Sequence, residues 1–170
     1  FNGQDYSLRN GTLELSEGGL LDVDNDTSIA SNIIISGNSS IDIAQDTTLT
    51  YSGESIDISI YQLTLLGSGT LSNHTYSVLL SNTDSLLILA DDITINLIEV
   101  KVNSATGKGI RVESEDAEVT TLNLAAELEL TFTDDSYELD VGVLNITSAA
   151  QLTGEGEDGL LVVTNLLQDD

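Results

Sequence analysis

The sequence contains no cysteine, which excludes disulfide bridges and thiolate metal ligands. It also contains no proline, although an average usage of about 5% would place about eight prolines in 170 residues. Proline interrupts the hydrogen-bond ladder of interior strands. The absence of proline is therefore typical of a fold in which most residues belong to paired strands.

Basic and aromatic residues are scarce. Four Lys and Arg oppose 29 Asp and Glu, which gives a net charge of −25. Phosphate groups need basic partners, so this charge argues against nucleic acid and anionic membrane surfaces as partners. No apolar run reaches about 18 residues, which predicts no membrane insertion. Two Phe, five Tyr and no Trp leave few rings to stack on sugars, which disfavours a polysaccharide-active enzyme.

The residues that are present favour strands. Hydrophobic residues make up 40% of the chain and are mostly Leu, Ile and Val, which is enough for one β-rich domain over residues 1–170. Apolar and polar residues alternate over short segments, and clusters rich in Gly, Asn and Asp separate these segments. The sequence therefore predicts an all-β fold.

A repeated tetrapeptide indicates how the strands are arranged. Ser40-Ile41-Asp42-Ile43 recurs as Ser55-Ile56-Asp57-Ile58, and Asp22 lies in a similar apolar/acidic alternation. The spacings between Asp22, Asp42 and Asp57 approximate one coil of a parallel β-solenoid (β-helix), in which stacked coils share a core. We therefore expect Asp42 and Asp57 to be stacked neighbours. The alternative is an antiparallel, jelly-roll-like β-sandwich.

The second half alternates over a longer run. Even positions from Leu122 to Phe132 are all apolar. Either the chain turns a corner at Ala125-Ala126, or this is one long sandwich strand. The sequence thus allows a solenoid part over residues 1–92 and a flanking, antiparallel β part over 93–170. The late apolar run Leu160–Val163 either closes the core or pairs with a neighbouring molecule.

One segment resembles a known family. Tyr61–Ser77 contains Gly67-Ser68-Gly69-Thr70-Leu71 followed by Asn73-His74-Thr75-Tyr76-Ser77, and it is similar to the autotransporter-associated β-strand repeats of bacterial surface proteins. The resemblance covers about a tenth of the chain. It implies a parallel β-helix of the surface-adhesin type and assigns no functional residue.

The best metal candidate is Asp22-Val23-Asp24-Asn25-Asp26. Its three carboxylates alternate, and Ca²⁺ prefers oxygen ligands. The EF-hand pattern fails, because Thr27 stands at its sixth position and Ile33 at its twelfth. We expect no cofactor other than this Ca²⁺. A hydrolytic triad is not expected either, because His74 is the single histidine and no Gly-x-Ser-x-Gly occurs.

The location is expected to be secreted or cell-surface. The chain begins without Met, as a processed secreted protein does and as a fragment of a longer chain would. Asn-x-Ser/Thr triplets make candidate glycosylation sites at Asn10, Asn25, Asn38, Asn73 and Asn145.

Three hypotheses of function follow from these patterns. The first is a non-enzymatic extracellular structural protein, a filament or stalk subunit whose partners are copies of itself. The second is an adhesin or carbohydrate-binding module that recognises surface glycans and depends on Ca²⁺. The third is a β-helical enzyme acting on polysaccharides.

Three of the four basic residues lie close together in the sequence, at Lys101, Lys108 and Arg111. They form either a charged hairpin turn or a patch that meets an acidic face of another subunit.

Overall fold

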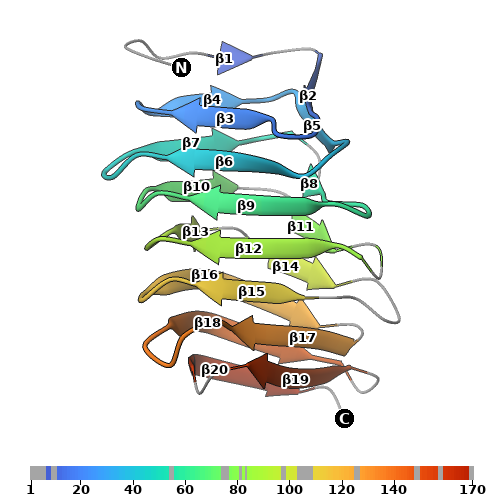
Figure 1. Cartoon of the computed structure of the whole chain (residues 1–170), viewed down its shortest axis with the longest axis vertical. Helices are drawn as coiled ribbons and strands as arrows, with labels where there is room; N and C mark the ends of the chain where they lie inside the picture. Colours follow the sequence, from blue (N-terminus) through green and yellow to red (C-terminus); the bar gives the residue numbers. More distant parts are fainter. Residues whose placement is uncertain are drawn as a thin grey trace.

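The computed structural model describes residues 7–8, 11–53, 56–73, 77–80, 82, 84–96, 99–102, 109–124, 127–147, 150–156 and 159–168. Within these residues the chain forms twenty β-strands and no helix. Every pairing between these strands is parallel. The fold is a β-solenoid, as the sequence predicts, and the antiparallel sandwich is excluded (Figure 1).

The strands stack in three columns, which we call the first, second and third sides of the solenoid. The first side contains β1 (Ser7–Leu8), β4 (Thr27–Ile29), β7 (Thr48–Tyr51), β10 (Thr70–Asn73) and β13 (Thr94–Asn96). The second contains β2 (Thr12–Leu15), β5 (Asn32–Ile35), β8 (Ile56–Asp57), β11 (Ser77–Leu80) and β14 (Glu99–Val102). The third contains β3 (Leu20–Val23), β6 (Ser39–Ile43), β9 (Gln62–Leu66), β12 (Leu86–Ala90), β15 (Ile110–Glu113), β17 (Glu127–Phe132) and β19 (Gln151–Gly156). Consecutive strands along the chain thus pass from side to side.

Three longer strands change this pattern in the C-terminal part. They are β16 (Ala117–Leu124), β18 (Glu138–Ile146) and β20 (Leu160–Gln168). The first half of β16 pairs with β13 and its second half with β14, so a single strand spans the first and second sides. Strands β18 and β20 follow the same path. Both sheets therefore continue through the second half of the chain, and an antiparallel flanking part over residues 93–170 is wrong.

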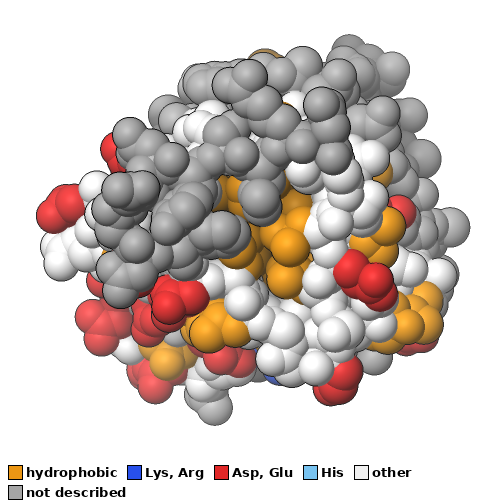
Figure 2. Space-filling model, turned by 90° about the horizontal axis from the view of Figure 1, so that it is seen from above, with side chains coloured by type: hydrophobic (Ala, Val, Ile, Leu, Met, Phe, Trp, Pro, Cys, Tyr) orange, Lys and Arg blue, Asp and Glu red, His pale blue; other side chains and the backbone are white. Residues whose placement is uncertain are grey.

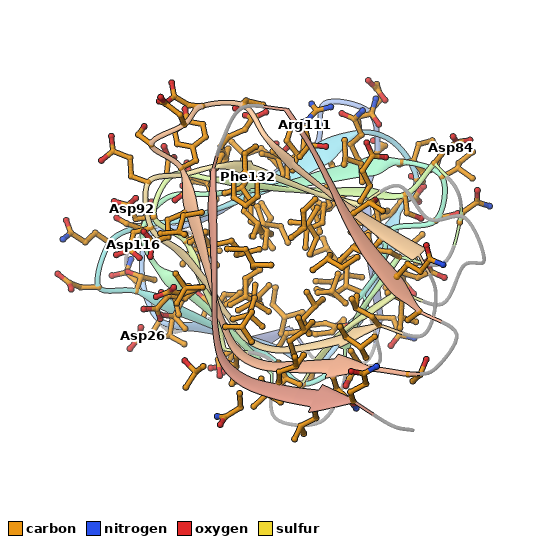
Figure 3. The ribbon with its side chains drawn as sticks, turned by 90° about the horizontal axis from the view of Figure 1, so that it is seen from below. Asp26, Asp84, Asp92, Arg111, Asp116 and Phe132 are labelled. Atoms are coloured by element: carbon orange, nitrogen blue, oxygen red, sulfur yellow. The ribbon has the colours of Figure 1, made fainter. Side chains whose placement is uncertain are left out.

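The alternating pattern explains which side chains enter the core. In β6, Ile41 and Ile43 are fully buried, whereas Ser40 and Asp42 between them point outward. The same alternation across the other strands builds one aliphatic core that also contains Tyr51 and Phe132. Seen along the stack, Phe132 points into this core, and the labelled aspartates point away from it (Figure 3).

The register corrects the expected spacing of the repeat. Leu21 pairs with Ile41 and Ile41 with Leu65, so successive coils differ in length, and both are longer than the step from Asp42 to Asp57. Asp42 therefore stacks on Asp22, not on Asp57. Asp57 lies on the second side, between Ile34 and Leu79. The repeated Ile-Asp pairs therefore lie on different sides of the solenoid. Alternation determines only whether a side chain points inward or outward, and it does not determine the side on which a strand lies.

The alternating run from Leu122 to Phe132 is not one long strand. It divides between β16 and β17, which belong to different sheets. The chain therefore changes direction between Leu124 and Glu127, as the corner interpretation requires. Ala125 and Ala126 themselves lie outside the described residues.

The segment that resembles autotransporter repeats forms β9, β10 and the start of β11. At the corner between β9 and β10, Gly67 has a φ of +80°. A Cβ at this position would collide with the carbonyl oxygen of Ile43 on the preceding coil. Only glycine fits this backbone conformation and this close approach.

Candidate functional site

The C-terminal end of the stack is formed by β19 and β20. In the described part of the chain, β19 pairs only with β17 and β20 only with β18. The outer edges of both strands therefore present backbone groups that no further coil of the described residues covers (Figure 1). Such edges accept additional strands readily.

Strand β20 is apolar on both faces. Leu161, Val163 and Leu166 are in register with the buried core residues of β18, so they continue the core column. Because no described coil follows, Leu161 and Val163 are only partly buried and Leu166 is 60% exposed. On the outer face, Leu160 and Val162 are also exposed.

The outer face of β20 differs from that of the preceding coil. Leu160 stacks on Glu138, and Val162 stacks on Asp140. The strand that ends the stack thus carries apolar residues where its neighbour carries carboxylates. A strand that is apolar on both faces is typical of a buried position. This end is therefore the best candidate interaction surface in the described structure.

The opposite end is formed by β1, β2 and β3. In the described residues, each of these strands pairs with one neighbour only. Seen from this end, apolar side chains lie near the centre of the cross-section and acidic side chains lie around its rim (Figure 2). Both ends thus present an apolar centre and parallel strand edges.

The predicted Ca²⁺ ligands Asp22, Asp24 and Asp26 are not among the described acidic groups whose carboxylate oxygens lie within 4.8 Å of one another. Asp22 lies on β3, and Asp24 lies in the turn that follows. Asp26 accepts a hydrogen bond from the backbone N–H of Thr48, 2.8 Å away, at the start of the first side. The chain turns a corner between β3 and β4, and Asp24 and Asp26 both lie in this turn. Asp26 instead connects two coils.

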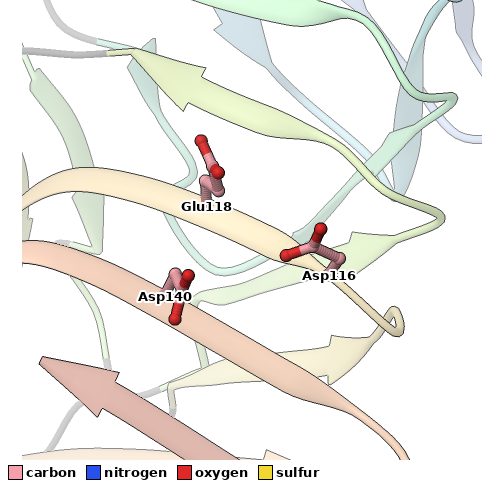
Figure 4. A group of neighbouring side chains, drawn as sticks. All are labelled: Asp116, Glu118 and Asp140. Atoms are coloured by element: carbon pink, nitrogen blue, oxygen red, sulfur yellow. The ribbon is translucent and has the colours of Figure 1, made fainter.

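A different acidic group does converge. Carboxylate oxygens of Asp116, Glu118 and Asp140 lie within 4.8 Å of one another (Figure 4). Asp116 and Glu118 are exposed, and one oxygen of Asp140 is buried without a hydrogen-bond partner among the described residues. In the sequence, this group is visible only as two acidic residues at alternate positions, Asp116 and Glu118, which lie one coil before Asp140. That signal cannot be used without knowing the coil length.

Two carboxyl groups have shifted pKa values. Partial burial, and then the negative charges of Asp22, Asp91 and Asp24, raise the pKa of Asp42. The pKa of Asp134 is lowered because its carboxylate accepts hydrogen bonds from the backbone N–H and the hydroxyl of Ser136. Asp42 is thus a side chain on which burial and neighbouring negative charge act in the same direction.

The candidate glycosylation sites lie in different settings. Asn25 and Asn38 are in turns, and Asn145 is on the outer face of β18. The Asn38 side-chain oxygen accepts the N–H of Gln62, 3.0 Å away. Asn73 ends β10, and Asn10 lies outside the described residues.

His74 and Lys108 lie outside the described residues, and Lys101 is in β14. Arg111 lies 3.9 Å from Glu113 on the same face of β15. Both side chains are well exposed, so this ion pair contributes little stability.

Comparisons with known families, with curated proteins and with solved structures find no match for this chain. None of the described residues form a helix with the length and apolar character that crossing a membrane requires.

Proposed function

We propose that this chain is a non-enzymatic structural protein of the extracellular space or cell surface, which associates end to end with copies of itself. The observation that carries this proposal is the C-terminal end, where β20 is apolar on both faces and its backbone edge is uncovered in the described structure. Exposed strand edges are otherwise blunted in monomeric proteins.

A second copy is the partner that fits this end best. Each end presents parallel strand edges around an apolar centre, so the first coil of one copy can continue the sheets of another. The two contacting surfaces differ, and the contact is therefore heterologous. Heterologous contacts that do not close on themselves generate filaments.

Charge directs the association toward the ends. The chain has a net charge of −25, and the aspartates labelled in Figure 3 point outward from the sides of the solenoid. Side-to-side contacts between copies are therefore repulsive. The apolar end carries the contact, and salt should promote it by screening the long-range repulsion.

An extracellular location agrees with the five Asn-x-Ser/Thr triplets and with the resemblance of Tyr61–Ser77 to repeats of bacterial surface proteins. Parallel ladders around one aliphatic core give a rod that needs no disulfide for rigidity. Such a rod suits a stalk or a filament.

The test places a charge in the apolar end. Leu166→Glu should leave the fold intact, because the side chain is already 60% exposed, and should abolish assembly by burying a carboxylate in the contact. Ile60→Glu is the matched control, because Ile60 is 50% exposed in the turn between β8 and β9. Sedimentation velocity and negative-stain microscopy at about 0.15 M salt provide the readout.

We expect wild type and Ile60→Glu to form linear assemblies whose length increases with concentration, and Leu166→Glu to stay monomeric. A wild-type chain that is monomeric at every concentration would overturn the proposal, and so would unchanged assembly of Leu166→Glu. Deleting residues 159–170 is a weaker test. That deletion uncovers Leu139, Val141 and Leu144 of β18 and so creates a new apolar end.

A further inference from the structure

The third side carries a shallow groove near the end that contains β3. Its volume is about 340 Å³, and it extends over β3, β6 and β9. The side chains that define it belong to Leu20, Asn38, Ser40, Gln62, Thr64 and Leu66. Ligand sites in proteins usually have volumes of about 300–1,000 Å³, so the groove is large enough for a small ligand.

Strand register builds the floor of the groove. Leu20, Ser40 and Thr64 are stacked residues of three successive coils, and all three point outward. Ser40 and Thr64 are short, whereas Leu66 and Gln62 on the same strand as Thr64 are longer. The column is therefore low at Ser40 and Thr64, beside the longer Gln62 and Leu66, and it rises at Leu20.

The groove offers several hydrogen-bonding groups. The Asn38 side-chain oxygen accepts the backbone N–H of Gln62, which holds the Asn38 amide in place and leaves its NH₂ group to donate. Among the described residues, no hydrogen bond engages the side chains of Ser40, Gln62 or Thr64. Ser39 contributes no hydroxyl to the groove, because its side chain is buried on the inward face of β6.

The lining carries no charge, although the chain contains 29 acidic residues. Leu20, which is 57% exposed, and Leu66 add apolar surface next to the hydroxyl and amide groups. Asp22 and Asp42 lie in the adjoining column of the same side. Their negative charge disfavours an anionic ligand.

We propose that this groove binds a neutral linear oligosaccharide, oriented along the solenoid axis. Sugar rings present hydroxyl groups at their edges and C–H groups on their faces, which matches alternating polar and apolar lining. Neighbouring coils are about 4.8 Å apart, and this spacing is close to the length of one pyranose unit. Successive sugars thus meet equivalent positions on successive coils. The groove lies on the outer face of β3, β6 and β9, whereas the proposed assembly uses the uncovered strand edges and the apolar centre of the two ends.

Isothermal titration calorimetry tests the proposal with cellotetraose, laminaritetraose and mannotetraose as neutral probes and tetragalacturonate as the anionic probe. We expect at least one neutral tetrasaccharide to bind at one site per chain, and tetragalacturonate to bind more weakly. Gln62→Ala and Thr64→Ala should each weaken this binding about tenfold, the effect of losing one hydrogen bond of typical strength.

Thr50→Ala is the matched control, because Thr50 also points outward from a strand but lies on the first side. It should leave the affinity unchanged, and thermal unfolding should show that all variants are folded. The proposal is overturned if no neutral tetrasaccharide binds, if tetragalacturonate binds as tightly as the neutral probes, or if Thr50→Ala weakens binding as much as Thr64→Ala.

Discussion

Stacking of Asp42 on Asp22 should lower the stability of the solenoid at low salt. The two residues are in register on neighbouring coils, and both point outward. At a separation of about 4.8 Å, two charges in water repel by about 0.9 kcal/mol. Screening reduces this to about 0.5 kcal/mol at 0.1 M salt and about 0.2 kcal/mol at 1 M. Asp42→Asn removes the repulsion and keeps the size of the side chain.

We therefore expect Asp42→Asn to raise the free energy of unfolding by about 0.5–1 kcal/mol at low salt, with the gain shrinking as salt is added. Asp57→Asn is the matched control. Its stacked neighbours are Ile34 and Leu79, and its carboxylate accepts the N–H of Ser59, which an Asn side-chain oxygen can also accept. Urea unfolding over a salt series provides the measurement.

The raised pKa of Asp42, caused first by burial and then by the charges of Asp22, Asp91 and Asp24, predicts a dependence on pH. Because the pKa of Asp42 is raised in the folded state, the folded chain binds a proton more tightly than the unfolded chain. The contribution of Asp42 to stability therefore falls as pH rises from the ordinary value of 3.8 through the folded-state pKa. The advantage of Asp42→Asn should vanish below that ordinary value. A gain that is independent of salt, or equal in Asp57→Asn, would refute the reasoning.

Three further outcomes are expected. Gly67→Ala should lower the free energy of unfolding by more than about 3 kcal/mol, because the added Cβ collides with a carbonyl oxygen of the preceding coil. Gly18→Ala is the control, because Gly18 has a φ of +72° but open space around its Cβ. It should lower the free energy of unfolding by only about 1 kcal/mol, as measured by urea unfolding. Tyr51→Phe should cost about 1–3 kcal/mol in thermal unfolding, because the buried hydroxyl accepts the N–H of Ile33. Native material from a glycosylating source should have a mass above that of the bare polypeptide, with glycan at Asn145 among the modified sites; a bare mass would contradict this.

Much of the fold could be predicted because alternation determines burial. Ile41, Ile43, Ile56 and Ile58 are all buried, as their pattern requires. Alternation does not say on which side of the solenoid a strand lies. The coil length therefore does not follow from the repeated tetrapeptide, and the expected stacking of Asp57 on Asp42 is wrong.

The candidate sites are less accessible to sequence reasoning, because they depend on which residues the register brings together. Asp140 meets Asp116 and Glu118 only when the intervening coil length is known. Ser40 and Thr64 share the groove for the same reason, since one full coil separates them. The apolar run Leu160–Val163 is visible in the sequence. Its position at the uncovered end follows only from the order of the strands.

The strictly parallel stacking has a consequence for how the molecule opens. Each described strand pairs only with the coil before it and the coil after it, so loss of one terminal coil removes a single set of ladders and leaves the remaining coils intact. Amide hydrogen exchange should accordingly be fastest in β20 and slowest in central strands such as β9 and β12. Under tension the solenoid should unwind from its ends, one coil at a time. A neighbour bound to the C-terminal end would slow this first step of unwinding.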